Sequence, residues 1–289
     1  MTDGRAWISA LDPRLERQRG ALGELLDFCE RTPEVTSLSV GCSLGRGAAD
    51  ELSDVDAAIG VAADLGADRG AQARSVEEAL VESLGAEGVV GVLREEPPSS
   101  EAVVRRVFVQ RADGVQLDLA VVPEPEVRRG DAAPDFVPLY RAEEVSGGPA
   151  APAPSAYAVS GDQMRAWAFL GWRALLDADK YLRRGSAWEA HQRLEEARHR
   201  VWQLWATAVG ASYPWHGLSQ VLDHDPTSLP PGIEATVAGV DLAELRDAVR
   251  AAADLLDEVS RAAARRWPTL VPSELAAYTR RVLAGEGRS

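Results

Sequence analysis

Residues 41–59 read GCSLGRGAADELSDVDAAI, and this stretch decides the fold. A loop rich in glycine and small residues, 42–53, leads into a predicted strand that begins at Asp54. Side chains on a strand alternate between its two faces, so Asp54 and Asp56 share one face. The opposite face is apolar and consists of Val55, Ala57 and Ile59. Two carboxylates backed by an apolar face predict a structured acidic site rather than a solvated sheet edge.

A third aspartate, Asp118, lies in a predicted strand of the same kind, residues 115–122. The alternation places Asp118 on one face and the apolar side chains on the core face: Leu117, Leu119 and Val121. The Asp113-Gly114 pair between residues 102–111 and this strand is a strong β-hairpin signal. If the strands of Asp56 and Asp118 are sheet neighbours, all three aspartates lie on one surface.

Three convergent carboxylates predict a metal site, because they cannot all stay ionised without a large cost in repulsion. Divalent cations relieve that repulsion, and Mg²⁺ suits carboxylates together with phosphate oxygens. Two Mg²⁺ ions held a few ångströms apart would stabilise an in-line phosphoryl displacement. The candidate metal-binding and catalytic residues are therefore Asp54, Asp56 and Asp118.

The loop that precedes Asp54 predicts a phosphate contact. Ser43 and the backbone of residues 44–47 follow a predicted strand at residues 35–41. A turn of this kind can present N–H groups to phosphates, and Arg46 is placed to offer a positive charge.

These features together resemble the signature of the DNA polymerase β-like nucleotidyltransferase superfamily. That signature is a Gly-Ser pair, ten or so residues, an Asp-x-Asp on a strand and a third aspartate on a later strand. Ten residues separate Ser43 from Asp54, and the resemblance covers roughly residues 20–125. The chain departs from the signature at Cys42, which stands in the place of the glycine, with Gly41 displaced by one position.

The resemblance implies a role for each of these residues. Asp54 and Asp56 would bind Mg²⁺, and Asp118 would complete the metal site or act as general base on an acceptor hydroxyl. Ser43 and Arg46 would contact the triphosphate of ATP, the expected co-substrate.

The plan of the chain resembles that of small antibiotic-modifying adenylyltransferases, which act on aminoglycosides and lincosamides. In these enzymes the nucleotide lies on the sheet domain and the acceptor sits in the cleft that faces the helices. Lys180, the only lysine of the chain, lies on the first helix after a linker. It would reach the phosphates from the helical domain; the alternative is a surface charge paired with neighbouring acids.

The expected fold class is α+β. A nucleotidyltransferase-fold domain with a mixed sheet and flanking helices occupies residues 1–145, and an all-helical bundle domain occupies residues 157–289. The linker, residues 146–156, reads SGGPAAPAPSA. The sheet domain is expected to hold helices at 11–31 and 72–85 and strands at 35–41, 54–61, 88–94, 102–111, 115–122 and 136–140. The bundle is expected to hold helices at 160–184, 187–209, 216–224, 241–267 and from 272 onward.

The net charge and the apolar content of the chain indicate which classes of molecule it is expected to bind. The net charge is −14, so duplex nucleic acid is not an expected partner, whereas cationic small molecules are attracted. No apolar run reaches the roughly 18 residues that span a membrane, and the N-terminus does not read as a signal peptide. We therefore expect a cytoplasmic protein without a membrane partner. Its oligomeric state stays open.

The cysteines and histidines do not predict a zinc site or a structural disulfide. Cys29 and Cys42 form no CxxC motif, and the four histidines are scattered, so neither a zinc site nor a structural disulfide is predicted. Arg193 and His199 have the loose spacing of an RNase motif of helical HEPN domains, but they fall on different faces of a helix. Glutamates on the second helix of the bundle are either a solvated face or contacts for a cationic acceptor: Glu189, Glu195 and Glu196. Most tryptophans of the bundle are expected in its core.

The sequence favours an enzyme that moves AMP from ATP to a hydroxyl of a small molecule and releases pyrophosphate. An aminoglycoside-like acceptor fits the acidic charge. The alternative is a toxin–antitoxin-type nucleotidyltransferase that modifies a protein or RNA, against which the acidity argues. A third interpretation, a non-catalytic nucleotide-binding module, is disfavoured by the intact aspartate set.

Overall fold

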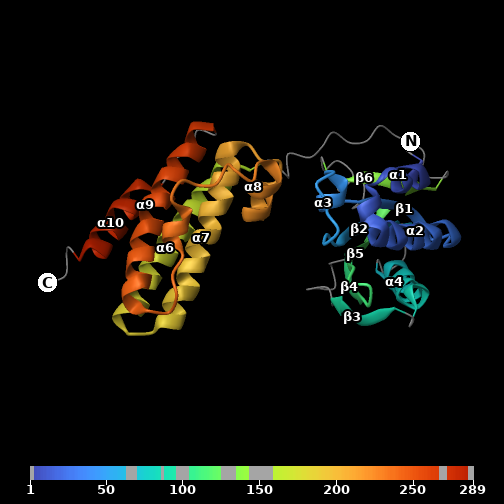
Figure 1. The fold of residues 1–289 in the computed structure, drawn as a ribbon, viewed down its shortest axis with the longest axis horizontal. Coiled ribbons are helices and arrows are strands. Elements are labelled where there is room, and N and C mark those ends of the chain that lie inside the picture. Colours follow the sequence, from blue (N-terminus) through green and yellow to red (C-terminus); the bar gives the residue numbers. More distant parts are fainter. Residues whose placement is uncertain are drawn as a thin grey trace. The chain divides into compact units, whose positions relative to one another are not determined.

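The computed structural model describes residues 3–62, 70–85, 88–95, 104–124, 135–142, 159–266 and 272–285. The chain divides into two compact units, Met1–Ser155 and Ala156–Ser289 (Figure 1). The predicted linker, residues 146–156, lies outside the described residues.

The first unit is built on a six-stranded sheet with the order β3-β4-β5-β2-β1-β6. Strands β2 and β5 are parallel, and every other neighbouring pair is antiparallel, so the sheet is mixed as predicted. All six predicted strands are present: β1 (Val35–Val40), β2 (Val55–Val61), β3 (Val89–Glu95), β4 (Arg105–Arg111), β5 (Gln116–Pro123) and β6 (Val137–Arg141).

Two helices, α2 (Glu16–Arg31) and α4 (Ala71–Leu84), cover one face of this sheet (Figure 1). Their apolar stripes share one core with the alternate residues of β2, β4 and β5. The largest contributors include Leu22, Leu25, Leu80, Ile59, Val107, Leu117 and Leu119. Burial of these side chains supplies most of the stability of the unit and leaves the other face of the sheet for polar groups.

The N-terminal region differs from the prediction of one helix over residues 11–31. A short helix, α1 (Gly4–Ala10), comes first, because the Asp3 side chain accepts hydrogen bonds from two N–H groups of its first turn. Asp12 and Pro13 then start a separate 3₁₀ turn, Pro13–Leu15, before α2 begins. The predicted loop 42–53 also starts as a single helical turn, α3 (Cys42–Gly45).

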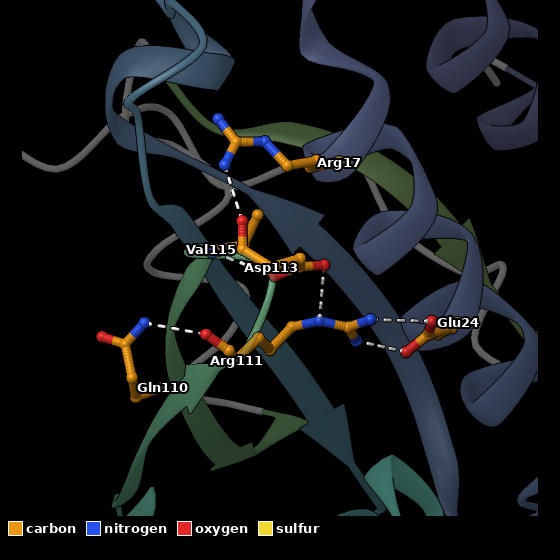
Figure 2. Close-up of polar contacts among 6 residues, drawn as sticks. All are labelled: Arg17, Glu24, Gln110, Arg111, Asp113 and Val115. Atoms are coloured by element: carbon orange, nitrogen blue, oxygen red, sulfur yellow. Dashed lines mark hydrogen bonds and ion pairs between the residues drawn. The ribbon is translucent and has the colours of Figure 1, made fainter. Parts of the chain in front are cut away.

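The turn between β4 and β5 is anchored to α2, as Figure 2 shows. Arg17 Nη1 donates to the carbonyl oxygen of Asp113 at 2.6 Å. Arg111 donates to both carboxylate oxygens of Glu24, at 2.6 and 3.2 Å, and lies 3.3 Å from Asp113 Oδ2. The predicted Asp113-Gly114 hairpin is confirmed, and these contacts fix the start of β5 against the core.

The second unit is helical, as predicted. Its helices are α6 (Gly161–Arg183), α7 (Ala187–Val209), α8 (Leu218–His224), α9 (Leu242–Arg266) and α10 (Ser273–Ala284), with 3₁₀ turns at Pro214–His216 and Ile233–Thr236. Ser160 caps α6 by accepting from Gln163 N, at the predicted start. Trp167 and Trp172 are core residues, whereas Trp188 is 75% exposed. None of the helices that the structure describes is long and apolar enough to cross a membrane.

Candidate functional site

Asp56 and Asp118 are direct partners on the parallel strands β2 and β5. Side chains of directly opposed residues lie on the same face of a sheet, so both carboxylates lie on the face opposite α2 and α4. The residues that flank them in each strand are buried in the core, in agreement with the predicted alternation. The expectation that these two strands are sheet neighbours is confirmed.

Asp54 lies one residue before β2 and is exposed, whereas Asp56 and Asp118 are half-buried. The carboxylate nevertheless acts on the pair, because its charge raises the pKa of both other aspartates. Asp54 therefore stands at the solvent side of the acidic cluster.

The electrostatics of the pair favour a bound cation. Burial, and after it the charges of Asp54 and Asp118, raises the pKa of Asp56 to about 6. Burial likewise raises the pKa of Asp118, against the lowering effect of Arg106, whose Nη1 lies 3.8 Å from Asp118 Oδ2. Carboxylates that are costly to ionise alone are stabilised by a cation between them.

The described side chains do not by themselves form a complete metal-binding site. Within the part of the chain that the structure describes, no three His, Cys, Asp or Glu side chains are arranged to hold a metal ion together. Mg²⁺, however, is commonly held by one or two carboxylates plus substrate phosphates. Asp56 and Asp118 fit that mode as a pair. The assignment of Mg²⁺ to Asp54, Asp56 and Asp118 together stays a prediction.

Helix α3 places Cys42 beside Asp56. The backbone at Cys42 has φ 52°, the left-handed conformation that glycine adopts most readily. Burial, and after it the charge of Asp56, raises the pKa of the Cys42 thiol to about 12, and the protonated thiol donates a hydrogen bond to the Asp56 carboxylate. Cys42, which stands in the place of the glycine of the superfamily signature, thus has a backbone conformation typical of glycine.

The predicted backbone donors of residues 44–47 are mostly used inside the loop. Gly45 N donates to Gly41 O, Arg46 N to Cys42 O and Gly47 N to Leu44 O, at 3.0 to 3.1 Å. The prediction that these three N–H groups face a phosphate is therefore wrong. The physical reason is that α3 forms a helical turn, whose own carbonyl groups accept them. Ser43 lies half-buried in this turn, and its phosphate contact stays a prediction.

Two residues that sequence reasoning missed, Asp135 and Phe136, hold this loop in place. Arg46 Nη1 lies 2.9 Å from Asp135 Oδ2, and the side chain of Asp135 is only 8% exposed. A Cβ atom on Gly45 would lie 1.8 Å from Asp135 O, and one on Gly41 would lie 3.1 Å from the Phe136 ring. Both residues follow a stretch without periodicity, so the only signal for them is the glycine pair at positions 41 and 45.

We expect Asp135→Asn to lower the free energy of unfolding by about 1–3 kcal/mol, because it removes the charge of a carboxylate that is only 8% exposed and forms an ion pair with Arg46. Urea denaturation at pH 7 measures this. The matched control is Asp162→Asn, which breaks an ion pair with Arg165 whose aspartate is 85% exposed. The control is expected to change stability by less than about 0.5 kcal/mol. Equal effects of the two variants would contradict a structural role for Asp135.

Lys180 lies on α6 in the second unit. Its Nζ lies 2.5 Å from Asp177 Oδ1 and 4.8 Å from the centre of the Tyr181 ring. The alternative interpretation, a surface charge paired with a neighbouring acid, thus describes its contacts within this unit. Its contact with a nucleotide phosphate stays a prediction.

The other polar candidates of the bundle are engaged locally. Arg193 pairs with Glu196 at 2.7 Å, and Arg198 pairs with Glu195. His199 is exposed on α7. Cys29 and Cys42 are both free thiols.

An open pocket of about 480 Å³ lies beside the aspartates on the sheet. Its walls come from β3, β4 and β5 together with Asp54. The lining residues are Asp54, Gly91, Val92, Leu93, Phe108, Val109, Gln110, Gln116, Leu117 and Asp118.

Comparison with known proteins gives structural likeness only. No family model and no curated protein matches the chain. Among solved structures, the chain is similar to an aminoglycoside 6-adenyltransferase from Bacillus subtilis, with 15% identity over 91% of this chain and 95% of that one, at a TM-score of 0.38. A nucleotidyltransferase-like protein from Exiguobacterium sibiricum has 14% identity over 83% and 74% of the two chains, at a TM-score of 0.37.

A third similar structure is the GLD-2/RNP-8 complex, with 13% identity over 84% of this chain and 69% of that one, at a TM-score of 0.32. At these identities and TM-scores the likeness says nothing about activity. The function proposed below therefore rests on the aspartate pair and its surroundings.

Proposed function

We propose that the protein transfers a nucleoside monophosphate, with ATP as the expected donor of AMP, to a hydroxyl group of a small molecule. The observation that carries the proposal is the Asp56–Asp118 pair. The two half-buried carboxylates are register partners on parallel strands, and burial raises the pKa of each. Asp54 precedes this pair, and ten residues separate it from Ser43 of the glycine-rich loop. Such an arrangement suits the binding of a metal-complexed nucleotide.

Each residue of the site would have a separate role in the transfer. Asp56 and Asp118 would hold Mg²⁺, which when bound neutralises charge on the phosphates and polarises the phosphorus under attack. Asp118, on the pocket side of the pair, would take the proton of the acceptor hydroxyl. Arg46, oriented by Asp135, supplies positive charge near Asp56.

We expect Asp118→Asn to lower Mg²⁺-dependent pyrophosphate release from ATP by about 10²- to 10⁴-fold, because both a metal ligand and a general base are lost. The assay compares aminoglycosides, lincosamides, tRNA and protein extract as acceptors. The control is Asp247→Asn, whose side chain is 79% exposed on α9. Unchanged release by Asp118→Asn would refute the site. Labelling of tRNA or protein alone would favour the toxin–antitoxin-type alternative.

A further inference from the structure

The aspartate pair separates two different surroundings. On the β1 side, Gly41 N donates to Asp56 O at 2.9 Å, so helix α3 begins directly beside Asp56. On the β4 side, Asp118 is the register partner of Phe108, and Phe108 is the partner of Leu93 on β3. A row across the sheet therefore runs from α3 through the two carboxylates to the pocket.

In-line displacement assigns the two sides to different reactants, and this step rests on the proposed function. The attacking oxygen and the leaving pyrophosphate must lie on opposite sides of the α-phosphorus. Arg46 directly follows α3 and therefore lies on the α3 side of the pair, where its positive charge lowers the pKa of Asp56. With the triphosphate on that side, the acceptor hydroxyl approaches from the side of Phe108.

The walls of the pocket indicate what it binds. Phe108 and Leu93, which is 62% exposed, offer an apolar surface. Gln116 Nε2 donates to Gln110 Oε1 at 2.8 Å, which fixes two amide groups at the rim. Two of the lining residues are aspartates, and among the described lining residues none is Lys or Arg. Arg106, whose Nη1 lies 3.8 Å from Asp118 Oδ2, is paired with that carboxylate.

We propose that the pocket over β3, β4 and β5 is the acceptor subsite, and that it takes a hydroxylated ring compound without net negative charge. The ring stacks on Phe108, and its hydroxyls bond to the amides of Gln110 and Gln116. The reacting hydroxyl oxygen forms a bond to the α-phosphorus, and the bond from that phosphorus to the bridging oxygen breaks. Pyrophosphate leaves with the electron pair, and the hydroxyl proton passes to Asp118.

The test measures binding to the full chain without nucleotide, so that it does not depend on transfer. Saturation-transfer NMR titrations use three cyclitol probes of similar shape: 2-deoxystreptamine, a cation; myo-inositol, which is neutral; and myo-inositol 1-phosphate, an anion. We expect the cation to bind at least about tenfold more tightly than the anion, because the rim is acidic. We expect Phe108→Ala to weaken binding of the cation about tenfold. The control, Phe169→Ala, removes a phenylalanine that is 48% exposed on α6 and is expected to leave binding unchanged.

A second variant keeps the test decisive if Phe108→Ala unfolds the sheet. Gln116 is exposed, so Gln116→Lys is expected to fold and to shift the preference toward the anion. Failure of every probe to bind overturns the proposal, as does binding that responds to Phe169→Ala but not to the two pocket variants. Pyrophosphate release is measured in parallel. If the probes bind at the pocket but no pyrophosphate is released, the proposed function is refuted and the binding site is not. If pyrophosphate is released at an unchanged rate by the pocket variants, the acceptor subsite is refuted and the proposed function is not.

Discussion

Replacement of Asp56 by asparagine is expected to abolish Mg²⁺-dependent transfer and, at the same time, to stabilise the folded protein at neutral pH. The loss of transfer follows from the loss of a metal-binding carboxylate in the centre of the pair, and we expect at least about a 10³-fold decrease in rate. The gain in stability follows from the surroundings of Asp56, which penalise its charged form.

The direction of the stability effect follows from the pKa of Asp56. The pKa is about 6 in the folded protein against 3.8 ordinarily, so the folded state binds this proton more tightly than the unfolded state. The carboxyl contributes its stability fully below pH 3.8 and loses it as the pH rises through about 6. At pH 7 the ionised group costs about 1–2 kcal/mol, a figure already reduced for the solvent that screens a half-buried charge. Asparagine removes that cost.

Urea denaturation of the metal-free protein and of Asp56→Asn, at pH 5 and pH 7, measures this. The stability gained by the variant is expected to be larger at pH 7 than at pH 5. Asp162→Asn, on an exposed ion pair of α6, controls for the general effect of removing a negative charge from an acidic chain. A destabilised Asp56→Asn variant, or one with full transfer activity, would show that Asp56 is a structural carboxylate.

Gly45→Ala is expected to have the largest effect on folding, because α3 and the Asp135 backbone leave no space for a side chain. The new Cβ atom would lie 1.8 Å from Asp135 O and 3.0 Å from Val40 O, and neither backbone atom can rotate away. Relief requires α3 to move from the sheet, which weakens the Arg46–Asp135 contact as well. We expect a loss of about 3 kcal/mol in the free energy of unfolding.

Gly47→Ala is the matched control, two residues further along the same loop. Nothing lies within 4 Å of its added Cβ atom, but the backbone has φ 71°. The expected cost is only the left-handed strain, about 1–2 kcal/mol. Thermal and urea unfolding of the two variants compare the effects directly. A Gly47→Ala variant less stable than Gly45→Ala would mean that backbone strain, rather than the clamp by Asp135, governs the loop.

Local pattern was sufficient for much of the fold. Alternation along residues 54–61 and 115–122 predicted which side chains enter the core, because a strand that is buried on one face must keep that period of two. Asp113-Gly114 predicted the hairpin, since Gly114 adopts φ 90° there. Ser160 predicted the start of α6 through its capping hydrogen bond.

Local pattern was not sufficient for the surroundings of the aspartates. The sequence predicts an open loop where the structure has helix α3, because this single turn is too short to show periodicity and is held by contacts with Asp135 and Phe136. The same contacts decide that the N–H groups of the turn bond to its own carbonyls. No spacing in the chain predicts a partner about ninety residues away.

The sequence by itself therefore determined the two kinds of unit, the faces of β2 and β5, and the three aspartates as candidates, because these depend on periodicity and short spacings. Only the tertiary structure decided that Asp56 and Asp118 are register partners, that Asp54 stands outside them, and that the pocket lies on the β4 side of the pair. Strand order and register arise from packing of the whole sheet against α2 and α4, and contacts distant in the sequence determine that packing.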